Sequence, residues 1–171
     1  MRHKLGFLLG LLLIQHSLAA APRKATQPNI LIIFTDDQGW GDLACYGNEN
    51  NKTPRMDQLA LEGTRFTQFY AQPVCGPSRS ALLTGRYPLR SLGWGMPASE
   101  ITWAELITQA GYQTACIGKW DVSNRKAIVE RMPNAQGFQY YFGALGANDG
   151  GKVTFHENNT AAGSTTDMGS L

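Results

Sequence analysis

The stretch Cys75-Gly76-Pro77-Ser78-Arg79-Ser80-Ala81-Leu82-Leu83-Thr84-Gly85-Arg86 decides how the rest of the chain is interpreted. Pro77 suits the first turn of an α-helix, where a missing backbone N–H costs nothing, and Gly85 suits a left-handed helix end. The stretch therefore predicts a helix that begins near Cys75. The unpaired N–H groups and the dipole of that helix favour an anion beside the thiol, and the guanidinium of Arg79 can reach the same place. The alternative is structural, with Cys75 as a small buried apolar residue and Arg79 on the surface.

A buried strand is predicted upstream of this helix. Asn29-Ile30-Leu31-Ile32-Ile33-Phe34-Thr35 is a continuous apolar run rich in β-branched residues, as in a central parallel strand covered on both faces. Asp36 and Asp37 end the run, and ligands of open α/β sheets bind beyond the carboxyl ends of strands. Two adjacent carboxylates repel one another unless a cation joins them, which makes this pair a candidate metal site. A solvated turn is the alternative.

Helices and strands alternate further along the chain. Thr53-Pro54 is suited to begin one helix, and the capping box Thr102-x-x-Glu105 is suited to begin another. Residues 65–70 and 112–117 have the composition of strands. This order predicts an α/β fold with a mainly parallel sheet.

The stretch that begins at Cys75 resembles the signature of type I sulfatases, a family of the alkaline phosphatase-like superfamily. The resemblance runs from Asn29 to about Gly143 and includes Asp36-Asp37-Gln38-Gly39-Trp40-Gly41-Asp42 and the segment Gly111–Lys119. It implies the N-terminal part of an alkaline phosphatase-like α/β/α sandwich. It also implies oxidation of the cysteine to Cα-formylglycine, the catalytic nucleophile of the family, and a divalent metal, most simply Ca²⁺.

The resemblance assigns roles to particular residues. Cys75, once converted, is the nucleophile and a metal ligand together with Asp36-Asp37, while Arg79 and Lys119 supply fixed positive charge to the sulfate. The family usually carries a histidine two residues after this lysine, whereas the present chain has Asp121. An aspartate can accept a proton in catalysis, but it also places a negative charge beside a bound sulfate. A surface position is the alternative for the lysine.

The implied activity is hydrolysis of aryl or carbohydrate sulfate esters. Two alternatives remain open: a phosphonate monoester hydrolase or phosphodiesterase of the same superfamily, which can share the Cys-x-Pro-Ser-Arg motif, and a non-catalytic sulfatase-like remnant. The implied partners are a sulfated small molecule or glycan and a formylglycine-generating or equivalent maturation enzyme. Because family members are considerably longer, we expect residues 29–171 to be an incomplete N-terminal portion of a catalytic domain that is inactive alone.

The N-terminus predicts export. Two basic residues precede the apolar run Leu5–Ile14, and small residues follow at Ala19–Ala21, which is typical of a cleavable signal peptide over residues 1–21. Residues 22–28 are a polar linker. The apolar run is too short to span a bilayer. We therefore expect a secreted, periplasmic or otherwise exported protein without a stable membrane anchor.

Charge and cysteine content limit the remaining possibilities. The chain has 15 basic and 13 acidic residues and becomes near neutral once the signal peptide is removed, so nucleic acid is not an expected partner. The three cysteines leave at least one thiol unpaired, and Cys45 and Cys116 can pair or stay buried. His156, beyond every motif, is expected in an exposed loop.

Overall fold

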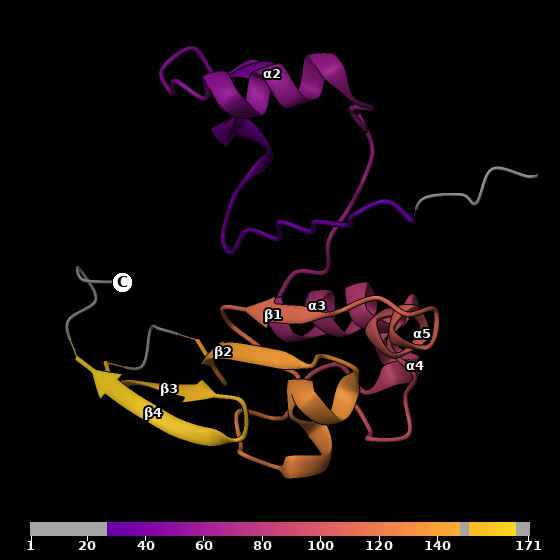
Figure 1. Ribbon diagram of the computed structural model, residues 1–171. Coiled ribbons are helices and arrows are strands. Elements are labelled where there is room, and N and C mark those ends of the chain that lie inside the picture. Colours follow the sequence, from indigo (N-terminus) through magenta and orange to yellow (C-terminus); the bar gives the residue numbers. More distant parts are fainter. Residues whose placement is uncertain (1–26, 148–150, 167–171) are drawn as a thin grey trace, which may run out of the picture. The chain divides into compact units, whose positions relative to one another are not determined.

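A computed structural model describes residues 27–147 and 151–166 of the chain (Figure 1). The chain divides into a first unit that ends at Asp37 and a second unit that begins at Gln38. The predicted signal peptide and most of the predicted linker lie outside the described residues. Among the residues described, no helix is long and apolar enough to cross a membrane.

The second unit contains a four-stranded mixed sheet in the order β1-β2-β3-β4. Strand β1 (Ala115–Ile117) pairs in parallel with β2 (Tyr140–Ala144), and Cys116 lies opposite Tyr141. Strands β3 (Val153–Glu157) and β4 (Thr160–Thr165) continue the sheet with antiparallel pairing. The parallel pair requires a long connection, whereas the last three strands follow one another directly.

The starts of α2 (Pro54–Glu62), α3 (Cys75–Thr84) and α5 (Trp103–Gln109) and the end of α3 lie where the sequence predicts. Helix α3 ends at Gly85 with a left-handed φ of 66°. Helix α5 begins with the reciprocal capping box of Thr102 and Glu105. The other helical segments are α4 (Pro88–Ser91) and the short 3₁₀ helices η1 (Trp40–Asp42), η2 (Ala44–Tyr46), η3 (Val129–Arg131) and η4 (Pro133–Gln136).

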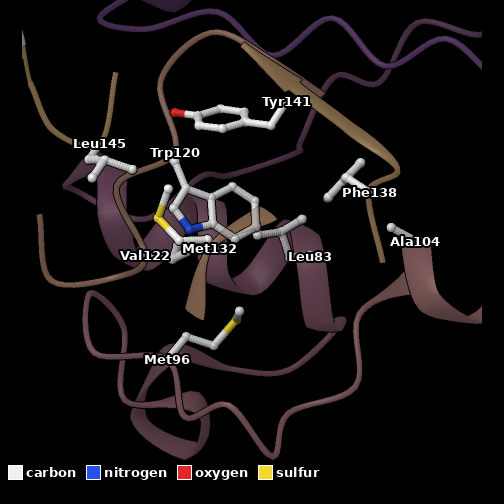
Figure 2. Close-up of a cluster of buried hydrophobic side chains, with 9 residues drawn as sticks. All are labelled: Leu83, Met96, Ala104, Trp120, Val122, Met132, Phe138, Tyr141 and Leu145. Carbon is white, nitrogen blue, oxygen red and sulfur yellow. The ribbon is translucent and has the colours of Figure 1, made fainter. Parts of the chain in front are cut away.

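A compact apolar core joins α3 and α5 to the sheet (Figure 2). The ring of Phe138 makes edge-to-face contacts with Trp103 at 5.5 Å and Trp120 at 6.0 Å between centroids. The buried apolar residues of the core are Leu83, Met96, Ala104, Trp120, Val122, Met132, Phe138, Tyr141 and Leu145. Phe138 and Tyr141 are thus buried in this core, whereas Tyr140 and Phe142 beside them are 39% and 38% exposed.

Two predicted strands and one predicted loop are wrong. Residues 29–35 and 65–70 are not in strands, and Leu31 and Ile33 of the first run are 84% and 74% exposed. An apolar pattern describes side chains only, whereas a strand also needs a hydrogen-bonding neighbour, which the pattern does not identify. His156, predicted in an exposed loop, lies in β3 opposite Gly143 and is 8% exposed.

The fold class agrees with the prediction of an α/β protein, since helices pack on a sheet that contains a parallel pair. The sheet of the described residues is mixed, because only β1 and β2 run in parallel. Figure 1 shows α3, α4 and α5 grouped beside β1, and the β3–β4 hairpin at the other edge. The end of β1 therefore lies near the start of α3, and the candidate site is built there.

Candidate functional site

The first turn of α3 carries the candidate nucleophile. Cys75 is the first residue of the helix, and Val74 precedes it without a side-chain cap. The buried hydroxyl of Ser78 fixes the entry of the chain, because its Oγ accepts a hydrogen bond from Gln72 N at 3.0 Å and donates to Val74 O at 2.9 Å. Because α3 begins at Cys75 without a side-chain cap, the unpaired N–H groups and the dipole of its N-terminus suit an anion beside Cys75.

The loop after β1 brings the second half of the site. Trp120 and Val122 enter the apolar core, 2% and 0% exposed, and hold the loop on the sheet. The chain continues alongside the end of β2, with hydrogen bonds from Trp120 N to Ala144 O at 2.9 Å and from Asp121 N to Leu145 O at 3.2 Å. Asp121, between the two core residues, adopts a left-handed φ of 58°. The core therefore holds this carboxylate from both sides along the chain.

A close approach of two glycines makes this path possible. Gly118 N donates to Phe142 O at 2.8 Å, and the backbone of Gly118 lies directly against Gly143 in β2. A Cβ at Gly143 would lie 1.8 Å from Gly118 O, a separation that no real side chain allows. Glycine at 143 is therefore what lets the loop with Lys119 and Asp121 begin where it does.

Asp121 and Cys75 meet directly. The Sγ of Cys75 lies 2.9 Å from Oδ2 of Asp121, whose side chain is completely buried. The ammonium of Lys119 lies 3.7 Å from the same oxygen, and the guanidinium of Arg79 donates to Lys119 O at 2.8 Å. The structure thus brings together all four predicted catalytic residues of the sequence.

Two residues that the sequence analysis missed complete the surroundings of Asp121. Trp94 Nε1 donates to Oδ2 at 3.1 Å, and Arg125 Nε donates to Oδ1 at 3.1 Å. The indole lies directly over Gly76, where an added Cβ would fall 1.5 Å from the ring. The one signal in the sequence was the spacing of Asp121 and Arg125, four residues apart, which indicates an ion pair only in a helix. The segment is not helical, so the spacing gave no reason to select the pair.

The other thiol near Arg79 is of a different kind. Burial raises the pKa of Cys116 to about 11, although the positive charge of Arg79 acts in the opposite direction. Cys116 contacts the edge of the apolar core and remains protonated at neutral pH. Cys45, Cys75 and Cys116 are all free cysteines. Of the two thiols near Arg79, the one at the helix N-terminus is therefore the candidate for chemistry.

The predicted metal ligands are not brought together. Asp36 and Asp37 belong to the first unit and Cys75 to the second, so the structure gives no distance between the aspartates and the thiol. Asp37 has a left-handed φ of 53°, which places the pair in a turn after the extended run. Within the described residues, no group of three or more His, Cys, Asp or Glu side chains is arranged to hold a metal ion. The two carboxylates suit a hard cation in kind but are an incomplete ligand set.

The arrangement around Cys75 can bind an anion and present an oxygen or sulfur atom to it. Two cationic side chains, Arg79 and Lys119, and the N-terminus of α3 supply positive potential. Asp121 supplies an acceptor for a proton on the position-75 side chain. Fixed donors and charges around a nucleophile are the means by which enzymes stabilise charge that develops in a transition state.

Comparison with known proteins identifies sulfatases as relatives of this chain. A family model described as Sulfatase matches residues 28–167. Arylsulfatase G from Mus musculus is 44% identical over 150 residues, which are 81% of this chain and 28% of that protein. Steryl-sulfatase from Rattus norvegicus is 41% identical over 160 residues, 82% of this chain and again 28% of the relative.

Solved structures also resemble this chain. One from work on the metabolism of multiple glycosaminoglycans by Bacteroides thetaiotaomicron has a TM-score of 0.68 and 36% sequence identity, and the match covers 80% of this chain and 32% of that chain. The present chain therefore spans less than a third of the length of these relatives.

We predict that Gly143→Ala destabilises the complete protein by about 1–3 kcal/mol, because the new methyl group must displace the backbone of Gly118. The measurement is the midpoint of urea unfolding. Gly41→Ala is the matched control, since an added Cβ there meets nothing within 4 Å. Equal midpoints for the two variants would contradict the close approach of Gly118 and Gly143.

Proposed function

Because this chain belongs to the sulfatase family of the alkaline phosphatase-like superfamily, we propose that the protein hydrolyses sulfate esters at Cys75. The single observation that carries the proposal is the 2.9 Å contact between Cys75 Sγ and the buried carboxylate of Asp121, at the N-terminus of α3 and beside Lys119. A thiol that served only for packing would not need a buried proton acceptor and an adjacent cation.

We propose that a maturation enzyme that recognises Cys75-Gly76-Pro77-Ser78-Arg79 converts Cys75 to Cα-formylglycine, using an external two-electron oxidant to replace the thiol by an aldehyde oxygen with loss of the sulfur as sulfide. The hydrate of the aldehyde supplies two hydroxyl groups on one carbon. One attacks sulfur while the bond between sulfur and the ester oxygen breaks and the alcohol leaves with a proton. The other then loses its proton, the C–O bond to the sulfate group breaks, sulfate leaves as the aldehyde forms again, and water restores the hydrate. The Sγ of Cys75 stands in the structure where an oxygen of that group would lie. The contact with Asp121 is thus one that a hydroxyl at position 75 can also make.

Different residues of this chain would bind the sulfate group and accept the proton. Arg79 and Lys119 bind and orient its oxygens, and the first N–H groups of α3 add to their positive potential. Asp121 accepts the proton of a hydroxyl at position 75, the role for which the family usually has a histidine. The indole of Trp94 holds the accepting oxygen of Asp121 in place.

A divalent cation, most simply Ca²⁺, is part of the proposal. Asp36 and Asp37 would hold it together with the position-75 side chain, and it would neutralise charge on the sulfate oxygens. The support is the chemistry of the donor set: two adjacent carboxylates are the ligands that calcium prefers, and like charges so close in sequence gain most from a cation.

A sulfated glycan is the substrate class that we favour over a small aryl sulfate. The support is the likeness to a structure from work on glycosaminoglycan metabolism. Arylsulfatase G and steryl-sulfatase, the relatives in sequence, bear the names of other sulfate esters. A panel of sulfated oligosaccharides and aryl sulfates would decide between the two classes.

We also propose export from the cell, on the strength of the basic residues, the apolar run Leu5–Ile14 and the small residues that follow. We predict that N-terminal sequencing of the protein purified from its source begins between Ala20 and Pro22. A mature protein that begins at Met1 would contradict export by this signal.

We predict that Cys75 of the complete protein, purified from its source, carries an aldehyde that mass spectrometry of the tryptic peptide detects. Cys75→Ala should abolish turnover of aryl sulfates, because no nucleophile remains at the helix N-terminus. Cys45→Ala, which removes a thiol elsewhere in the second unit, should keep turnover within about twofold. A wholly unmodified thiol, or equal activity of the two variants, would contradict the proposal. Faster turnover of phosphonate monoesters than of sulfate esters would place the protein in the other branch of the superfamily.

We predict that Asp36→Ala lowers the calcium affinity of the complete protein by about tenfold or more, because one charged ligand is lost. Isothermal titration calorimetry with Ca²⁺ measures the effect. Asp42→Ala is the control: this carboxylate accepts a hydrogen bond from Gly39 N at 2.7 Å and serves the local turn. Asp36→Ala and Asp42→Ala with the same calcium affinity would rule out the assignment.

A further inference from the structure

We propose that Arg125 restores the positive charge that Asp121 removes from the sulfate site, so that the two residues form a neutral pair beside the nucleophile. The inference rests on the proposed function of the site and adds Arg125, which lies outside the motifs described above. It answers a difficulty that the sequence alone raises, since an aspartate next to Cys75 disfavours a bound anion.

The two oxygens of Asp121 have different partners. Oδ2 is the oxygen next to the proposed nucleophile: it lies 2.9 Å from Cys75 Sγ, 3.1 Å from Trp94 Nε1 and 3.7 Å from Lys119 Nζ. Oδ1 faces away and accepts a hydrogen bond from Arg125 Nε at 3.1 Å. Arg125 therefore neutralises the carboxylate from behind and leaves the position-75 side chain in contact with Oδ2.

The turn that carries Arg125 is built to hold it there. Asn124 and Arg125 have left-handed φ angles of 55° and 58°, a conformation that costs free energy in residues other than glycine. Asn124 N donates to Trp94 O at 2.8 Å, and Gly95 pairs with Ser123 in an antiparallel bridge. These contacts fix the turn on the segment that also carries the indole.

The side chain of Arg125 is held at two further points. Its guanidinium lies 5.7 Å from the ring centroid of Trp94, within range of a cation–π contact. Its aliphatic part lies over Gly146, where an added Cβ would be 3.2 Å from Cγ and Cδ. The side chain is still 52% exposed, so solvent weakens the pair, and the expected effects are modest.

The effect of the Asp121–Arg125 pair on anion binding follows from the net charge of the site. With Arg79 and Lys119 alone the site carries two positive charges, and Asp121 reduces this to one. Arg125, which bonds the other oxygen of Asp121 from the one near Lys119, restores it to two. Removal of Arg125 should therefore weaken anion binding, whereas removal of the charge of Asp121 should strengthen it, and removal of both should leave the affinity nearly unchanged.

The experiment measures the affinity of the complete, converted protein for inorganic sulfate by calorimetry, which does not depend on turnover and therefore also applies to variants of the proposed proton acceptor Asp121. For Arg125→Gln we expect about threefold to tenfold weaker binding, and for Asp121→Asn binding that is tighter by a similar factor. The double variant and Arg125→Lys should each lie within about twofold of wild type. Lys126→Gln, which removes a charge from an exposed side chain of the same turn, is the matched control and should also lie within about twofold.

Three results would overturn the inference while leaving the proposed function intact: sulfate affinity unchanged in Arg125→Gln, a double variant as weak as Arg125→Gln, or an equal loss in Lys126→Gln. The double variant also guards against misfolding, because it leaves no buried carboxylate without its cation. A wild-type protein that neither binds sulfate nor turns over sulfate esters would overturn the proposed function and this inference with it.

Discussion

The buried carboxylate of Asp121 is the constraint on which the rest of the site depends. Its side chain is 0% exposed, and an unpaired charge in such a place costs several kcal/mol, of the order of 3–5 kcal/mol when a partner is removed. Four groups stabilise the buried carboxylate: Arg125, the Trp94 indole and the Cys75 thiol through hydrogen bonds, and Lys119 through an ion pair. Because Arg125 is half exposed, the contacts on the inner oxygen carry more of the compensation.

The same constraint explains why a core that contains no functional residue matters to the site. Trp120 and Val122, on either side of Asp121, are buried in the apolar cluster and fix the loop on β2. Gly143 allows Gly118 to approach, and Gly76 allows the indole of Trp94 to lie over the first turn of α3. Packing therefore determines where the carboxylate lies, and the charges follow from that position.

The sequence predicted the parts of the fold that depend on local chemistry. Gly85 correctly predicted where α3 ends, and the capping box at Thr102 correctly predicted where α5 begins. Both signals are local, because a left-handed helix end and a side-chain cap involve only neighbouring residues. Strands depend on distant partners, and here the predictions failed: residues 29–35 are not in a strand, and β1 is only the last part of the predicted strand 112–117. Likewise, the motifs predicted Cys75, Arg79, Lys119 and Asp121, whereas Trp94 and Arg125 reach Asp121 through a turn that no local pattern indicates.

The most direct test of this account is a crystal structure of the complete protein with an unconverted Cys75, at a resolution that places the carboxylate of residue 121 without ambiguity. We expect Asp121 Oδ2 within hydrogen-bonding distance of Cys75 Sγ and of Trp94 Nε1, with Arg125 on the opposite oxygen. A carboxylate turned away from the thiol, with Lys119 paired elsewhere, would contradict the claim that Asp121 organises the site.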